Sequence, residues 1–140
     1  MVARAAWQQC GKYEWSNNLN QENNRLESIR ALARSFVEER DWGQFHTPKN
    51  LSSALSVEAA ELLEHFQWIK TGVREELGED KLVQVRHEMA DVLVYLVLLA
   101  DRLDVDLGAA VEEKMALNRA KYPADKVRGD ARKYHEYPPD

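Results

Sequence analysis

The chain has 140 residues, and its 24 Asp and Glu outnumber its 19 Lys and Arg, which gives a formal net charge of −5. This length fits one domain, and the single cysteine, Cys10, excludes an internal disulfide and favours the cytoplasm. An acidic chain lacks the basic surface that dominates binding to a nucleic-acid polymer. The longest apolar run, residues 92–100, is far shorter than the ~20 residues that cross a bilayer. We therefore expect no nucleic-acid polymer partner, no membrane span and no secretion signal.

Residues 1–21 show no convincing period, and we expect them to form a loosely ordered arm whose role the sequence does not indicate. Apolar residues at helical spacing predict a first helix over residues 22–40. Residues 41–48 interrupt this pattern. A second helix should begin near Pro48, whose fixed φ suits a first helical position, and run to about Ile69, with Gly72 ending it.

A third helix should run from about Glu79 to Leu103, and its segment 92–100 is apolar on every side, which is typical of a helix that is buried all round. Asp106 is a plausible N-cap for a fourth helix that ends at Lys121, before Pro123. Residues 124–140 should form a weakly ordered tail. A domain this small could hardly surround the third helix alone, so we expect a partner subunit to cover one side.

No segment alternates apolar and polar residues over a useful length, so the sequence predicts an all-α protein. The expected architecture is a four-helix bundle over residues 22–123 that forms a dimer or a dimer of dimers.

Two pairs of acids fall where the helices should be apolar. In the second helix, Glu58 lies inside the stripe formed by Leu51, Leu55, Leu62 and Ile69, and Glu61 lies at its edge. In the third helix, Glu88 lies inside the stripe and Asp91 at its edge, with the same three-residue step. Residues three apart share a helix face, so helices packed on these stripes would point four carboxylates at a common space.

Four carboxylates in an apolar environment repel one another, and a cation resolves that repulsion. Oxygen ligands favour Mg²⁺, with Mn²⁺ as a substitute, over zinc or copper. Acids three residues apart are also common on solvated helix faces, and this account suits Glu64, which projects away from the stripe. It fits Glu58 and Glu88 poorly.

Two other metal sites fit the spacing less well. The segment from His87 to Asp91 differs from the HExxH zinc motif at its last position. A di-iron site requires a histidine three residues after a glutamate, whereas His65 follows Glu61 by four. We therefore expect His65 and His87 to be ordinary polar or packing residues.

The spacing of the two acidic pairs, with 26 residues between Glu61 and Glu88, resembles the metal motif of the MazG-like superfamily of all-α nucleotide pyrophosphohydrolases. More specific segments accompany it, and they resemble the dCTP pyrophosphatase branch. These segments are residues 39–51 (ERDWGQFHTPKNL), residues 66–68 (FQW) and residues 114–123 (KMALNRAKYP).

The resemblance implies hydrolysis of a nucleoside triphosphate, with dCTP preferred, to the monophosphate and pyrophosphate. Glu58, Glu61, Glu88 and Asp91 would hold the metal, with Glu61 and Glu58 as the catalytic residues. One of the four acids, with Glu61 as the first choice, would also align the attacking water. Such chemistry needs cations on the phosphate oxygens and a metal that lowers the pKa of water. The repulsion between the acids and the triphosphate leads us to expect two or more ions.

The resemblance also implies the residues that surround the substrate. They are Trp42, Gln44, Phe45, His46, Trp68 and Tyr95 around the base and sugar, and Lys114, Asn118, Lys121 and Tyr122 near the phosphates. By the residues alone, aromatic side chains usually indicate a core, and a basic helix face is usually just solvated. Ala33 departs from the vertebrate pattern, which has a base-contacting histidine there, and a smaller residue leaves dATP or a modified pyrimidine open as substrate.

Two alternatives remain open from the sequence. One is a non-catalytic nucleotide or metal sensor that uses the same pocket to regulate a partner. The other is a purely structural helical oligomer whose acidic residues lie at a hydrated interface between subunits.

Overall fold

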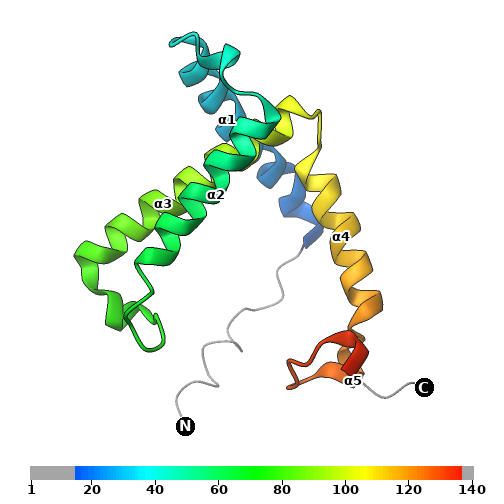
Figure 1. Cartoon of the computed structure of the whole chain (residues 1–140). Helices are drawn as coiled ribbons and strands as arrows, with labels where there is room; N and C mark the ends of the chain where they lie inside the picture. The colour runs from blue at the N-terminus through cyan, green and yellow to red at the C-terminus, as the bar shows by residue number, and fades with distance from the viewer. Residues whose placement is uncertain (1–14, 137–140) are drawn as a thin grey trace. The chain divides into compact units, whose positions relative to one another are not determined.

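The computed structural model describes residues 15–136, which are helical or irregular throughout and contain no strand (Figure 1). This confirms the all-α prediction. The chain forms two compact units, the first ending at Leu99 and the second beginning at Ala100. Each unit is described by itself below. Within the described part of the chain, no helix is both long enough and apolar enough to cross a membrane.

Helix α1 spans Trp15–Glu38, so it begins seven residues before the predicted start at Glu22. The polar run before Glu22 carries no helical period, which is why its helical state was not visible in the sequence. The rest of the predicted arm, residues 1–14, lies outside the described residues.

Helix α2 spans Pro48–Glu64, and Pro48 stands in its first turn as predicted. The hydroxyl oxygen of Thr47 accepts a hydrogen bond from the Asn50 backbone N–H at 3.2 Å, which caps the helix. The helix ends five residues before the predicted Ile69. A tight turn follows, in which Gly72 adopts a φ of 74°, and a Cβ at that position would lie 2.9 Å from the Phe66 ring.

Helix α3 spans Arg74–Arg102, with a break at Gly78, where φ is 70° and ψ is 167°. The long helical stretch therefore begins at Glu79, as predicted, and a single extra turn precedes it. Glycine tolerates this backbone conformation because it has no Cβ.

Helix α4 spans Leu107–Lys121, and the Asp106 carboxylate accepts from the Ala109 backbone N–H at 3.0 Å. Asp106 is therefore the N-cap that the sequence predicts. Beyond Pro123, the predicted tail contains a short helix α5, Ala124–Val127, which was not expected. Two short 3₁₀ turns complete the described chain: η1 (Trp42–Gln44) and η2 (Tyr134–Glu136).

The core of the first unit joins its three long helices. Ala33 and Val37 of α1 pack with Leu51 of α2 and Leu98 of α3, and Leu51 is only 1% exposed. Val94, Tyr95 and Leu99 pack against this cluster. Leu51 lies near Leu98 while Glu58 lies near Glu88, so α2 and α3 run antiparallel. This pairing brings the two acidic motifs together.

Candidate functional site

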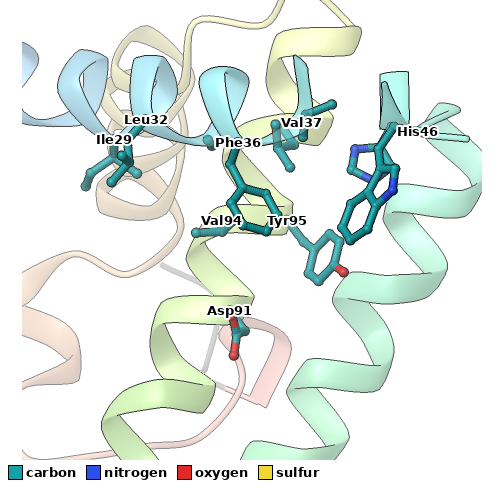
Figure 2. A pocket seen from close by; sticks show the side chains of 11 residues that line it. Ile29, Leu32, Phe36, Val37, His46, Asp91, Val94 and Tyr95 are labelled. Atoms are coloured by element: carbon teal, nitrogen blue, oxygen red, sulfur yellow. The ribbon is translucent and has the colours of Figure 1, made fainter. Parts of the chain in front are cut away.

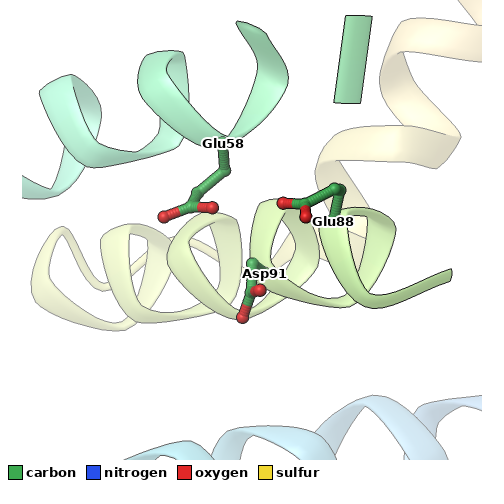
Figure 3. A group of neighbouring side chains, drawn as sticks. All are labelled: Glu58, Glu88 and Asp91. Carbon is green, nitrogen blue, oxygen red and sulfur yellow. The ribbon is translucent and has the colours of Figure 1, made fainter. Parts of the chain in front are cut away.

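Three of the four predicted acids converge between α2 and α3. Glu58, Glu88 and Asp91 each offer one carboxylate oxygen, and these oxygens lie within 4.8 Å of one another. Figure 3 shows the Glu58 carboxylate reaching from α2 toward that of Glu88 on α3. Glu58 and Glu88 are partly buried and Asp91 is exposed, which agrees with the first two lying inside an apolar stripe and Asp91 lying at its edge.

Glu61 is the member of the predicted quartet that does not converge on the others. Its side chain is exposed, and none of its oxygens joins the group of three. It lies near enough to act electrostatically on Glu58, whose pKa it helps to raise. Glu61 therefore stands at the rim of the acidic group.

The electrostatics of Glu58 suit a bound cation. Desolvation raises the pKa of Glu58 above its ordinary value, and the charges of Glu61, Asp91 and Glu88 raise it further. Like charges that crowd a partly desolvated site disfavour ionisation until an opposite charge arrives. An all-oxygen donor set of this kind favours a hard divalent cation such as Mg²⁺ or Mn²⁺ over zinc or copper.

Two histidines border this group without joining it. The Nε2 atom of His65 lies 3.9 Å from a carboxylate oxygen of Glu88, which is too long for a hydrogen bond. His87 is exposed on α3, and its side chain is not part of the converging group. This arrangement agrees with the expectation that both are polar neighbours.

A cavity of about 510 Å³ opens beside the acids. Helix α1, the α1–α2 connection and α3 supply its walls (Figure 2). Its lining residues are mostly apolar or aromatic: Ile29, Leu32, Ala33, Phe36, Val37, Trp42, His46, Asp91, Val94, Tyr95 and Leu98. A concave, largely apolar space with a few polar groups is the usual form of a small-molecule site.

Aromatic side chains form one wall of this cavity. The rings of Phe36 and Trp42 meet edge to face, with centroids 5.8 Å apart, and the Trp42 and His46 rings follow at 6.4 Å. The guanidinium of Arg40 lies 3.7 Å from the centre of the Phe36 ring. Such contacts hold aromatic rings in defined orientations.

Asp91 and Tyr95 connect the cavity to the acidic group. Asp91 belongs to both, and Tyr95 follows it by one turn of α3. Burial raises the pKa of the Tyr95 hydroxyl, and the nearby charges of Glu58 and Asp91 raise it further. The tyrosine therefore stays neutral and can donate a hydrogen bond at the junction of the two regions.

Several predicted substrate residues lie outside this cavity. The Gln44 side-chain amide turns back and donates to the backbone oxygen and the carboxylate of Asp41. Phe45 is exposed, and Trp68, in the turn after α2, is 92% exposed. These three side chains do not line the cavity of this chain.

The predicted phosphate residues stand on α4, in the second compact unit. Lys114, Asn118 and Lys121 are spaced four and three residues apart and share one face of this helix. Tyr122 follows at the C-cap, with its backbone N–H donating to the carbonyl of Asn118.

The sequence did not identify Phe36 or the aliphatic lining as parts of a site. Phe36 lies on the apolar side of α1, which also supplies the core residues Ala33 and Val37. The same face extends past the core and forms the cavity wall. Helical spacing identifies such a face, but it does not distinguish core from cavity. Ala33, which the resemblance singled out, does line the cavity.

Comparisons with known proteins agree with this picture. The chain is 48% identical over 115 residues to dCTP pyrophosphatase 1 of Homo sapiens, an alignment that covers 81% of this chain and 68% of the human protein. It is 46% identical over 116 residues to dCTP pyrophosphatase 1 of Rattus norvegicus, with the same coverage. These relatives support the predicted branch.

A solved structure is also similar. The crystal structure of a pyrophosphatase from Archaeoglobus fulgidus matches with a TM-score of 0.65 and 42% sequence identity, covering 71% of this chain and 93% of that one. The model of the MazG-like family matches residues 53–137, which include both acidic pairs. With this match and these relatives, the chain belongs to the MazG-like family.

Proposed function

We propose that the protein is a nucleotide pyrophosphohydrolase that converts dCTP to dCMP and pyrophosphate with Mg²⁺ and so removes unwanted nucleotides. The observation that carries this proposal is the shared position of Asp91, which belongs both to the acidic group and to the wall of the aromatic cavity. A nucleotide has the same two parts side by side, an aromatic base and a phosphate chain that needs cations.

The base and sugar occupy the cavity in this proposal. Trp42 and His46 offer aromatic faces for stacking, and base stacking on an aromatic side chain typically contributes about 1–3 kcal/mol. Few polar groups line the cavity, and Ala33 leaves space where a larger residue would fill it. A cytosine that carries a small apolar substituent is therefore a candidate substrate beside dCTP itself.

The phosphates lie toward Glu58, Glu88 and Asp91, the residues that would hold the divalent cations. A metal bound there would supply charge neutralisation on the phosphate oxygens and a lowered pKa for the attacking water. Exposed Glu61, at the rim of this group, is positioned for a role that needs contact with solvent, and we assign it the alignment of that water together with Glu58. Attack occurs at the α-phosphorus, and pyrophosphate leaves.

Three further elements belong to the proposal through the family resemblance. Lys114, Asn118, Lys121 and Tyr122 contact the phosphates, and Gln44, Phe45 and Trp68 contribute to the substrate site of the assembled enzyme. The assembly is a homodimer or homotetramer. Exposed apolar side chains on α3, among them Met89, Leu93 and Leu96, support an interface there.

Phosphorus NMR tests the reaction directly. With Mg²⁺ present, the dCTP resonances should give way to those of dCMP and pyrophosphate. Release of orthophosphate and dCDP would contradict α–β cleavage. Tight binding of dCTP in calorimetry with no hydrolysis in Mg²⁺ or Mn²⁺ would instead identify a nucleotide sensor.

Single variants test the residue assignments. Asp91→Asn and Glu61→Gln should each lower turnover by about 100-fold or more, because each removes a charge that serves the metal or the water. Glu64→Gln is the matched control, since Glu64 is exposed at the end of α2 and lies outside the converging group. Full turnover in either test variant would remove that residue from the site.

A further inference from the structure

The aromatic wall of the cavity comes from a short connection between two helices. Trp42 and His46 line the cavity, but they lie in residues 39–47, between the end of α1 and the start of α2. Connections of this kind are usually the most mobile parts of a fold. The position of this wall therefore depends on the bonds that hold the connection in place.

Hydrogen bonds within the connection give it a defined shape. The Gln44 amide donates to the Asp41 backbone oxygen at 3.0 Å and to the Asp41 carboxylate at 2.9 Å. These bonds close a turn in which Asp41 has a φ of 52°. The Phe45 backbone N–H donates to the Trp42 carbonyl at 2.9 Å.

One side chain ties this shaped connection to the helix that follows. The Asn50 Nδ2 atom donates to the Phe45 backbone oxygen at 2.8 Å, while the Asn50 backbone N–H donates to the Thr47 hydroxyl. Phe45 lies directly before His46, and Asn50 directly before Leu51, which is the most deeply anchored residue of α2. The bond therefore joins the aromatic wall to the buried core.

The same helix carries an acid of the proposed metal site. Glu58 follows Asn50 by eight residues, which is about 12 Å along a helix axis. We infer that Asn50 is a positioning residue that sets the Trp42–His46 wall relative to Glu58, and hence the base relative to the phosphates. This inference rests on the proposed function, because it takes the cavity as the base site.

Asn50→Asp separates this role from a general effect on stability. The variant keeps the shape of the side chain and the backbone bond to Thr47, but it loses the donor and turns a carboxylate toward the Phe45 carbonyl. A negative charge in the first turn favours a helix, so α2 should stay as stable as in the wild type. Ser53→Ala is the matched control, since the Ser53 hydroxyl donates to the Lys49 carbonyl within the same helix and does not contact the connection.

Fluorine NMR and steady-state kinetics together test the role of Asn50. The chain has 4 tryptophans, so labelling with 5-fluorotryptophan gives a small set of resonances, and Trp42→Phe and Trp68→Phe assign two of them. In Asn50→Asp without nucleotide, the Trp42 resonance should shift or broaden while that of Trp68 stays in place. The KM for dCTP should rise about fivefold with kcat changed less than about twofold, and Ser53→Ala should match the wild type in both readouts.

Two results would overturn the inference: an unmoved Trp42 resonance in Asn50→Asp, or a moved resonance with an unchanged KM. A wild-type protein that releases no pyrophosphate from dCTP would instead overturn the proposed function. In that case the position of the Trp42 resonance in Asn50→Asp alone shows whether Asn50 fixes the position of Trp42 and His46.

Discussion

Asp91 and Tyr95 stand one turn apart on α3, and both line the same cavity while Asp91 also belongs to the acidic group. Because the spacing along one helix fixes this relationship, Asp91 and Tyr95 cannot move apart without unwinding α3. Asp91 also acts electrostatically on both regions. Besides burial, its charge helps to raise the pKa of Tyr95 in the cavity and the pKa of Glu58 in the acidic group.

Removing the charge of Glu58 should stabilise the metal-free protein and abolish its response to Mg²⁺. The raised pKa of Glu58 means that folding disfavours its ionised form, and Glu58→Gln removes that cost at neutral pH. We expect the Tm of Glu58→Gln to rise above that of the wild type without metal. Millimolar Mg²⁺ should not raise the Tm of the variant further, whereas it should raise that of the wild type. Differential scanning calorimetry measures both. A lower Tm, or a retained Mg²⁺ response, would contradict the assignment.

Shortening Trp42 should weaken substrate binding and leave metal binding intact. Trp42→Ala removes a cavity wall and the edge-to-face contact with Phe36, so the KM for dCTP should rise about tenfold. Trp42→Phe keeps an aromatic face and should therefore raise the KM for dCTP much less. Steady-state kinetics give KM, and the Mg²⁺-induced change in Tm serves as the control. An unchanged KM in Trp42→Ala would exclude Trp42 from the base site.

The turn between α2 and α3 should loosen in acid. The Glu76 carboxylate accepts from the backbone N–H groups of Thr71 and Gly72 at 2.9 and 3.0 Å, and these bonds lower the pKa of Glu76 below its ordinary 4.5. A lowered pKa in the folded state means that this contribution to stability is present above pH 4.5 and is lost as pH falls through the lower value.

Amide hydrogen exchange measured by NMR checks this expectation. Thr71 and Gly72 should be protected near neutral pH and lose that protection in acid, and Glu76→Gln should weaken the protection near neutral pH. Glu75→Gln is the matched control, because Glu75 adjoins Glu76 in the first turn of α3 and neither bond involves it. Equal protection in Glu76→Gln and the wild type would mean that other contacts hold the turn.

A charge on the exposed face of α3 should dissociate the proposed oligomer. Leu93 and Leu96 are each 37% exposed in the single chain, although their segment is apolar on all sides. Leu96→Glu places a charge where a second subunit would bury it, and that is costly without a partner. Light scattering at micromolar concentration should give a dimer or larger for the wild type and a monomer for the variant. A monomeric wild type would contradict the interface.

The sequence by itself determined the helix starts that depend on local bonds. Pro48 stands in the first turn of α2, and Asp106 caps α4 through a bond to a backbone N–H three residues away; both were predicted because such signals lie within one turn. It also determined that Glu58 and Glu88 lie on apolar faces, because helical periodicity assigns each residue a direction.

Only the tertiary structure decided which of these residues meet. Helix α2 ends at Glu64, and the Phe66 ring then lies close to Gly72 in the turn that follows, a contact that helical spacing does not encode. Asp91 converges with Glu58 whereas Glu61 does not, although both lie at the edge of their stripes and both are exposed. Periodicity gives the direction of a side chain around its own helix, but the distance to a neighbouring helix depends on how the two pack, and that is set by contacts between residues far apart in the chain.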